Sequence, residues 1–209
     1  MVNLGIPEGW NKIKIGDIFT FKNGLNKSKE FFGIGSPIVN YMDVYKNRGL
    51  KRRNVQGKVN VNKRELESYN VKKGDVFFTR TSETPEEVGL TSVMLEDIPN
   101  SVFSGFILRA RPKNEILLDE YKKYCFSTKE VRNEIVSKST FTTRALTNGK
   151  VLSQIEILVP SKDEQQKIAT ALSDMDDLIE SLEKIIDKSL ERNIPIIKPN
   201  KIPIPPISA

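Results

Sequence analysis

The sequence predicts an α+β protein: a globular domain with a mixed or antiparallel sheet and short helices, followed by a long helix of the coiled-coil type. Two patterns support this prediction. Up to residue 160, short β-branched and aromatic runs end at Gly, Asn or Pro, which is typical of strands joined by turns. From residue 161, apolar residues recur every three or four positions, which is the period of one helical face. The change of period separates a sheet domain from a helix.

Strand-sized runs follow one another along the sheet domain. The first begins after Trp10, where NKIKIGDIFTF alternates apolar and polar residues before an Asn-Gly turn. Further strands are expected at residues 36–44, 74–81, 88–95, 101–112 and 153–160. The segment EFFGIGSP, residues 30–37, is expected to form a turn because it holds two glycines. Its phenylalanine lies one residue too close to the glycines for the F-x-G-x-G loop of methyltransferases.

Helical spacing first appears in residues 119–139. We expect two helices there, interrupted near Ser127. Cys125 falls on their apolar face, so it is interpreted as a small core residue rather than a nucleophile.

The C-terminal helix is predicted for residues 161–192. Pro160 ends the preceding strand, and Ser161 with Glu164 fits the S-x-x-E capping box, which satisfies free N–H groups of a first turn. Its apolar residues are expected to form a helix–helix interface: Ile168, Leu172, Met175, Ile179, Leu182 and Ile186. The alternative is packing on its own domain, but about 30 helical residues span about 45 Å, more than that domain needs. Residues 193–209 contain five prolines and are expected to form an extended tail.

The composition excludes most familiar catalytic chemistry. The chain has no histidine and one cysteine, so it lacks the residues for a Ser-His-Asp triad, a Cys-His pair or a Cys/His zinc site. Carboxylate, lysine or tyrosine chemistry stays possible, but a non-catalytic protein without a metal site is the first expectation. The sequence shows no signal-peptide pattern and no apolar run near the roughly 20 residues that span a bilayer, which predicts a cytoplasmic protein.

The charge is unevenly distributed. Residues 162–192 hold five basic and nine acidic residues, a net charge of −4, whereas the rest of the chain carries +10. A basic body with an acidic helix suggests a polyanion on the body and a protein partner on the helix. Scattered, solvated lysines are the simpler alternative.

Four loops combine Lys or Arg with Asn, Ser, Thr or an aromatic residue: residues 21–29, 45–54, 79–83 and 137–150. This mixture suits a nucleic-acid surface, because cations and hydroxyls bind phosphates while Arg and Asn can also contact base edges. The candidates for base or groove contacts are Arg80, Arg144, Thr142, Thr143, Asn40 and Tyr41. The candidates for phosphate contacts are Lys22, Lys27, Arg48, Arg52, Arg53 and Lys138. Taken singly, each loop could equally be a solvated turn.

Five segments stand in a recognisable order between residues 6 and 168, within a resemblance that spans about residues 7–188: IPEGWNKIKIGDIFTFKNG, PIVNYMDV, VKKGDVFFTRTSETPEEVGLTSV, FSGFILRARP and STFTTRALTNGKVLSQIEILVPSKDEQQKI. Their order resembles the target recognition domain of the specificity (S) subunits of type I restriction-modification systems. The resemblance implies a non-catalytic subunit that reads one half of a bipartite DNA sequence and docks methyltransferase (M) subunits through its helix. S-adenosylmethionine would then belong to the M subunits and ATP to the restriction (R) subunits, which join through the M complex.

The sequence departs from the family pattern in one respect. Members carry two recognition domains and two spacer helices, whereas this sequence holds one of each and resembles half of an S subunit. Two copies joined through their helices would form a homodimer that reads an inverted repeat. The alternatives are a stand-alone dimeric DNA-binding or regulatory protein and a truncated, silent specificity cassette. A self-contained nuclease or methyltransferase is disfavoured because neither a D…E-x-K nor a [DNS]-P-P-[YF] motif is present.

Overall fold

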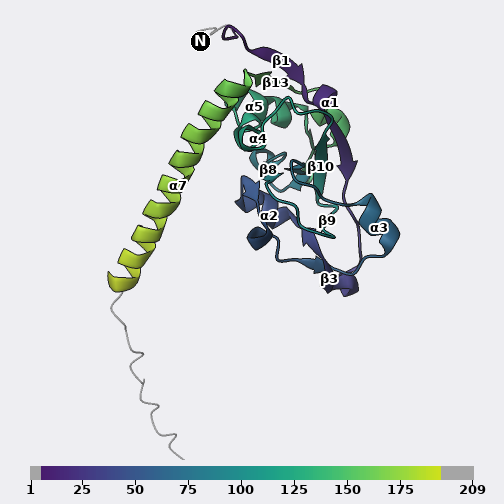
Figure 1. Cartoon of the computed structure of the whole chain (residues 1–209). Helices are drawn as coiled ribbons and strands as arrows, with labels where there is room; N and C mark the ends of the chain where they lie inside the picture. Colours follow the sequence, from purple (N-terminus) through teal and green to yellow (C-terminus); the bar gives the residue numbers. More distant parts are fainter. Residues whose placement is uncertain (1–5, 194–209) are drawn as a thin grey trace, which may run out of the picture. The chain divides into compact units, whose positions relative to one another are not determined.

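The computed structural model describes residues 6–193, with side chains described as far as Lys188 (Figure 1). Contacts divide the chain into two compact units, residues 1–170 and 171–209. The predicted tail lies outside the described residues, except that Asn193 is the last residue of the long helix.

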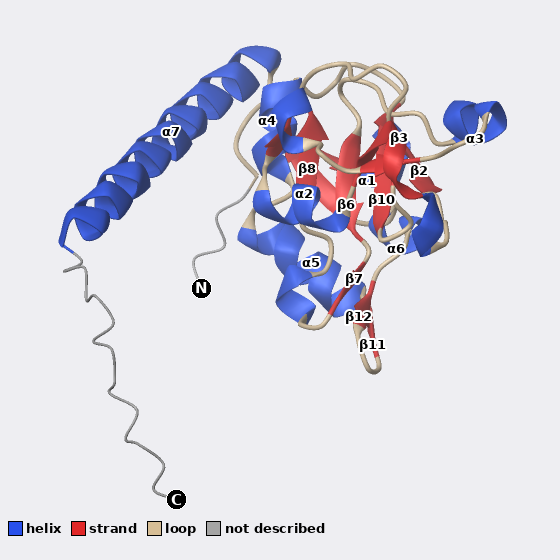
Figure 2. Cartoon of the chain, turned by 90° about the horizontal axis from the view of Figure 1, so that it is seen from below, coloured by secondary structure: helices blue, strands red, loops and turns tan. Residues whose placement is uncertain are grey.

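A five-stranded sheet forms the centre of the first unit (Figure 2). Its strands, in spatial order, are β2 (Phe19–Asn23), β10 (Ile107–Pro112), β6 (Val76–Thr79), β8 (Thr91–Met94) and β4 (Gly49–Leu50). All pairs are antiparallel except β4 with β8, which is parallel. The predicted mixed sheet is therefore confirmed.

Three smaller sheets complete the first unit. The first is a pair, β1 (Asn11–Lys14) with β13 (Glu156–Val159). In the second, β3 (Phe32–Val39) lies between β5 (Lys58–Val59) and β9 (Val102–Phe103). In the third, β12 (Ala145–Leu146) lies between β11 (Thr140–Phe141) and β7 (Thr81–Ser82). This last sheet lies at one end of the central sheet (Figure 2).

Short helices connect and cover the strands. They are α1 (Ile15–Ile18), α2 (Tyr41–Lys46), α3 (Lys63–Ser68), α4 (Asp119–Cys125), α5 (Lys129–Lys138), α6 (Gly149–Leu152) and the 3₁₀ helices η1 (Lys29–Phe31), η2 (Arg52–Asn54) and η3 (Pro85–Glu87). The two helices α4 and α5 confirm the predicted pair and its interruption near Ser127. Cys125 is buried in the core, as predicted, and its burial raises the pKa of its thiol.

Strand β6 explains where the core lies. All four of its residues are buried, and because neighbouring strand residues point to opposite faces, Phe77 and Phe78 enter different hydrophobic clusters. On one face Phe78 packs edge-on against Phe126, with ring centroids 5.3 Å apart. On the other face Phe77 packs against Phe103 at 5.8 Å. Two packed faces fix this strand, and the groups at its ends, in place.

Three local predictions were wrong. The run after Trp10 is interrupted by α1, which separates β1 from β2. The end of the strand expected at residues 36–44 is instead α2, because the Asn40 backbone N–H donates to Asp43 Oδ2 at 2.8 Å and starts a helix. The expected glycine turn at residues 30–37 is largely part of β3, with Gly33 and Gly35 at φ values of +104° and +98° around an irregularity in its pairing with β5.

Helix α7 (Lys162–Asn193) begins at the predicted capping box. The Glu164 N–H donates to Ser161 Oγ, and the Ser161 N–H donates to Glu164 Oε2, both at 3.3 Å. The first turns belong to the first unit, where Ala169 is buried in the core and Ile168 packs against it. The predicted boundary at residue 160 therefore marks the start of the helix rather than the limit of the compact unit.

The second unit consists, as far as it is described, of α7 from Ala171 onward. Five of the six predicted interface residues are exposed there: Leu172, Met175, Ile179, Leu182 and Ile186. Leu178 and Ile185 are exposed as well. The sixth predicted residue, Ile168, packs on the first unit instead.

Candidate DNA-binding surface

A surface cleft of about 310 Å³ lies where β6 ends. Its lining residues are Tyr41, Thr81, Ser82, Glu83, Glu87, Phe106 and Arg144. They come from four separate parts of the chain, and strand pairing brings them together. Two of the predicted base-facing residues, Tyr41 and Arg144, meet in this cleft.

The backbone around the cleft is fixed on both sides of Arg80. The Arg80 N–H donates to the Phe106 carbonyl at 3.1 Å, and the Arg80 carbonyl accepts from the Thr147 N–H at 3.0 Å. Beyond Arg80, β7 pairs with β12, with Ser82 opposite Ala145. Loop side chains are thereby presented from a rigid frame, which a recognition surface needs.

Arg80 is half-buried and carries an unsatisfied donor. Its Nε is buried without a hydrogen-bond partner among the residues that the structure describes. A buried donor without a partner costs about 1–3 kcal/mol, and more when the group is charged. The exposed part of this half-buried side chain adds a positive charge beside the cleft, which suits a ligand that supplies acceptors, such as a nucleic acid.

Arg144 lies at the tip of the β11–β12 hairpin. Its side chain is 64% exposed, and its Nη2 atom is 3.7 Å from Glu83 Oε1. Thr142 and Thr143 occupy the same three-residue loop and are exposed. The hairpin thus brings three of the predicted base-facing residues together.

Aromatic side chains accompany these groups. Phe106 is 65% exposed, and Phe141 in β11 is also exposed. Tyr41 and Tyr45 stack with ring centroids 6.0 Å apart, and Tyr45 Oη donates to Glu87 Oε1 at 3.0 Å. Exposed aromatic rings beside arginines are typical of surfaces that contact bases.

Glu87 is held in place by neighbouring hydroxyl groups. Ser82 Oγ donates to Glu87 Oε2 at 2.9 Å. The hydrogen bonds from Ser82 and then Tyr45 lower the pKa of Glu87, and the bond to Glu87 raises the pKa of Tyr45. Glu87 is therefore a fixed anion that organises the floor of the cleft.

Arg132 in α5 secures the turn that carries Glu87. Its guanidinium donates to the carbonyls of Gly89 at 2.7 Å, Glu86 at 2.8 Å and Val88 at 2.7 Å. Burial lowers the pKa of Arg132. Because all three acceptors are backbone atoms, Arg132 positions the turn and leaves its side chains available.

The remaining predicted base-facing residue does not line this cleft. Asn40 precedes α2, and its side-chain amide donates to the Ile38 carbonyl at 3.3 Å. It supports the start of a helix.

Several predicted phosphate contacts are engaged within the protein. Lys22 Nζ donates to the Ser68 carbonyl at 2.7 Å, and burial lowers the pKa of Lys22. Lys27 pairs with Glu65 at 2.9 Å. Lys138 pairs with Glu134 within α5. An amine that already has a partner must exchange it before it can bind a phosphate.

The other predicted phosphate contacts are three arginines that lie elsewhere on the unit. Arg48 lies over the ring of Tyr124, 5.7 Å from its centroid. Arg52 and Arg53 are exposed in η2 and line a different cleft. The structure does not bring these arginines to the cleft at β7.

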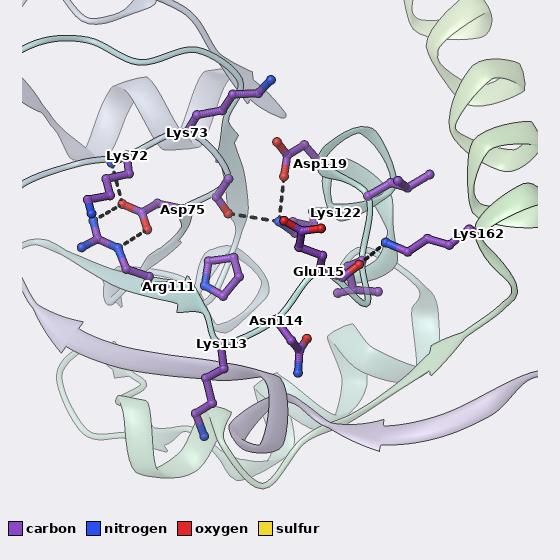
Figure 3. Close-up of a pocket in the computed structure, with 14 residues that line it drawn as sticks. Lys72, Lys73, Asp75, Arg111, Lys113, Asn114, Glu115, Asp119, Lys122 and Lys162 are labelled. Atoms are coloured by element: carbon purple, nitrogen blue, oxygen red, sulfur yellow. Dashed lines mark hydrogen bonds and ion pairs between the residues drawn. The ribbon is translucent and has the colours of Figure 1, made fainter.

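A larger pocket of about 550 Å³ lies at the opposite end of β6 (Figure 3). Its charged groups largely satisfy one another. Arg111 Nε and Nη2 each donate to Asp75 at 2.7 Å and form a bidentate salt bridge. Lys122 pairs with Asp119 at 2.7 Å and donates to the Gly74 carbonyl at 3.3 Å. This pocket is an internal ion-pair network, so the cleft at β7 is the better candidate site.

The described residues, 6–193, contain neither a candidate metal site nor a candidate membrane span. No group of three or more Cys, Asp or Glu side chains among them could hold a metal ion. None of their helices is both long enough and apolar enough to cross a bilayer.

The sequence matches a family of DNA specificity proteins over most of its length. The profile described as "Type I restriction modification DNA specificity domain" matches residues 7–192. The chain is 33% identical over 189 residues to the type I restriction enzyme MjaIX specificity subunit of Methanocaldococcus jannaschii, covering 86% of this chain and 40% of that protein. It is 26% identical over 187 residues to the EcoKI specificity subunit of Escherichia coli K12, covering 88% and 39%.

Solved structures share the fold. An S subunit from M. genitalium aligns with a TM-score of 0.56 at 20% identity, covering 90% of this chain and 44% of the other. The HsdS subunit from Thermoanaerobacter tengcongensis aligns with a TM-score of 0.60 at 16% identity, covering 88% and 41%. The fold is that of a target recognition domain with a long C-terminal helix. The chain belongs to the type I restriction-modification DNA specificity domain family, and it spans about 40% of the length of its curated relatives.

Sequence reasoning missed Glu83, Phe106 and Arg132 as parts of the site. Phe106 follows Ser-Gly at a turn, outside the alternation of β10, which is a signal that could have identified it. Arg132 lies in a helix whose charges look solvated in the sequence, and only the fold shows that it contacts the turn at residues 86–89.

Proposed function

We propose that this chain is a non-catalytic subunit of a type I restriction-modification complex and reads one half of a bipartite sequence in double-stranded DNA. The observation that carries the proposal is the cleft at the end of β6, lined by Arg144 and Phe106, next to Arg80, a half-buried arginine whose Nε has no hydrogen-bond partner among the described residues. These groups offer cationic donors and an apolar ring, which are suited to phosphates and base edges. Family membership supports the same role.

The second unit supports the proposed assembly. The described part of α7 beyond Ala171 exposes a stripe of large apolar residues, which is the pattern of a helix that packs against another helix. We propose that this stripe docks M subunits and joins two copies into a homodimer, while R subunits join through the M complex. In this assembly the M subunits bind S-adenosylmethionine and the R subunits bind ATP. The complex would act in the cytoplasm.

The test is to coexpress the chain with an adenine methyltransferase (M) subunit from the same organism and to map N6-methyladenine across a genome. A bipartite inverted repeat is the expected result, because two identical recognition domains read the same half-site in opposite directions. An asymmetric target would refute the homodimer and require a second, different recognition domain. Absence of sequence-specific methylation by an intact complex would contradict the proposal.

A stand-alone DNA-binding or regulatory protein is the second candidate, because an exposed apolar stripe also suits a simple dimer. Co-purification separates the two. An M subunit retained through size-exclusion chromatography supports the complex, whereas a DNA-binding dimer that retains no M subunit supports the alternative.

A further inference from the structure

Two side chains of opposite charge face each other in the cleft and are only loosely paired. Glu83 Oε1 and Arg144 Nη2 are 3.7 Å apart, beyond a normal hydrogen bond, and the side chains are 85% and 64% exposed. Ion pairs this exposed contribute little to folding. Within residues 6–188, neither side chain makes another hydrogen bond or ion pair. Both groups can therefore take up a ligand at little cost.

Strand pairing brings the neighbours of these residues together. In the antiparallel β7–β12 pair, Thr81 lies opposite Leu146 and Ser82 opposite Ala145. Glu83 directly follows Ser82, and Arg144 directly precedes Ala145. The two residues therefore leave the same end of a paired ladder, which holds their backbones close together.

The pair matches one base pair in chemistry. In the major groove, a G·C pair presents the N7 and O6 acceptors of guanine beside the amino donor of cytosine. A guanidinium beside a carboxylate presents donors beside acceptors, which is the complementary pattern. We propose that Arg144 and Glu83 together read one G·C base pair through the major groove, with Arg144 on guanine and Glu83 on the cytosine amino group. This inference rests on the proposed DNA-reading function and adds Glu83 as a specificity residue.

The carboxylate of Glu83 is expected to affect DNA binding in a different way from a cationic side chain. Thymine presents an O4 acceptor and adenine an amino donor, so an A·T pair in the same orientation would place acceptor against Glu83 and donor against Arg144. Phosphates also repel Glu83, which lowers affinity for random DNA. Replacing Glu83 should therefore raise binding to random DNA while it lowers discrimination, a combination that loss of a phosphate contact cannot produce.

The experiment uses the full chain in complex with its coexpressed M subunit and a library of randomised DNA duplexes. The wild-type complex should select a sequence in which one position is fixed as G·C. Glu83→Ala and Arg144→Ala should each relax that same position by about 10- to 100-fold and leave the other positions unchanged. Glu83→Ala should also bind random duplex more tightly, and Arg144→Ala less tightly. Thermal unfolding should be unchanged for both, because both side chains are exposed.

Glu86→Ala is the matched control. Glu86 lies three residues along the same turn, is exposed and does not line the cleft, and the substitution removes the same charge. It should relax no position. If Glu86→Ala relaxes the G·C position as much as Glu83→Ala does, the effect is one of net charge and the inference is wrong.

Base analogues identify the groove. Inosine keeps the major-groove pattern of guanine and removes only its minor-groove amino group, so an I·C pair should bind as well as G·C. The analogue 7-deazaguanine lacks N7 and should weaken wild-type binding about tenfold, with no further loss in Arg144→Ala. Loss of binding with inosine would place the contact in the minor groove and overturn the inference.

The remaining outcomes separate this inference from the function on which it rests. If the wild-type complex selects no sequence, the proposed DNA-reading function itself is refuted. If it selects a sequence and Glu83→Ala relaxes no position, the function stands and the Glu83–Arg144 assignment is refuted.

Discussion

The two ends of the β6–β10 pair carry an arginine each, and the arginines are in opposite states. At one end, Arg111 forms a two-pronged pair with the buried Asp75. At the other end, Arg80 leaves its buried Nε without a partner among the described residues. Both ends belong to the same rigid ladder, so the difference lies in the side chains and not in the backbone. The Asp75–Arg111 pair stabilises the fold, whereas Arg80 has no carboxylate partner among the described residues and adds a positive charge beside the cleft.

The largest expected effect is at the end of the β6–β10 pair where Arg111 is paired with Asp75. Asp75→Ala leaves Arg111 beside Arg109 without the carboxylate, so we expect the free energy of unfolding to fall by about 3–5 kcal/mol. Urea denaturation measures this loss. Asp97→Ala is the control, because Asp97 is an exposed acid close to the same rim and accepts one backbone hydrogen bond from Lys73; a loss of at most about 1 kcal/mol is expected. Equal losses for the two variants would show that the Asp75–Arg111 pair is not special.

Next in size is Arg132→Ala. It removes three charge-assisted hydrogen bonds to the carbonyls of the turn at residues 86–89, and we expect a loss of about 2–3 kcal/mol in the free energy of unfolding. Sequence discrimination should also weaken, because the turn carries Glu87. Lys129→Ala removes one charge from an exposed position of the same helix and should change neither quantity. An unchanged stability in Arg132→Ala would contradict the assigned role.

Arg80→Met tests the other end of the β6–β10 pair, where the Arg80 Nε has no partner among the described residues. Methionine keeps the length of the side chain but removes the buried donor, so stability should be unchanged or higher. Binding to the selected sequence should weaken by about 1–3 kcal/mol, as measured by titration of duplex DNA. Arg64→Met, on the exposed side of α3, carries the same change in charge and should weaken target and random DNA equally and slightly. A drop in stability without loss of specific binding would reverse the assignment of the two ends.

The smallest effect is expected for Lys72→Ala combined with Lys73→Ala. Both lysines line the pocket beside the Asp75–Arg111 pair, away from the cleft at β7. Sequence discrimination should therefore change by less than about 0.5 kcal/mol. Competition between target and random duplexes measures it. A loss of discrimination comparable to that of Arg80→Met would show that DNA also reaches this end of the sheet.

Local patterns predicted the elements that depend on local chemistry. The Ser161–Glu164 capping box, the α4 and α5 pair and the continuous apolar run of β6 were all readable, because each depends on residues close in sequence. Helix α2 was missed because the backbone bond from Asn40 to Asp43 overrides the strand propensity of the residues between them.

The candidate site could be predicted from the sequence only in part, for a different reason. Arg80 and Arg144 were identifiable as loop arginines, but their shared backbone frame depends on pairing between segments more than 60 residues apart. Lys22 was predicted as a phosphate contact, yet its amine bonds Ser68, 46 positions away. Composition shows which groups can bind DNA, and only the fold shows which of them are already occupied.

The contact between Arg132 and the turn has an implication for how this surface could change over generations. Every amino acid supplies a backbone carbonyl, so a substitution at position 86 would keep that hydrogen bond to Arg132. Gly89 is fixed, because a Cβ there would lie 2.6 Å from Ile135 Cγ2. The turn therefore combines a fixed glycine at position 89 with an exposed side chain at position 86 that is free to vary. Such a turn is a natural place for new sequence preferences to arise without loss of the fold, and a practical one for redesign.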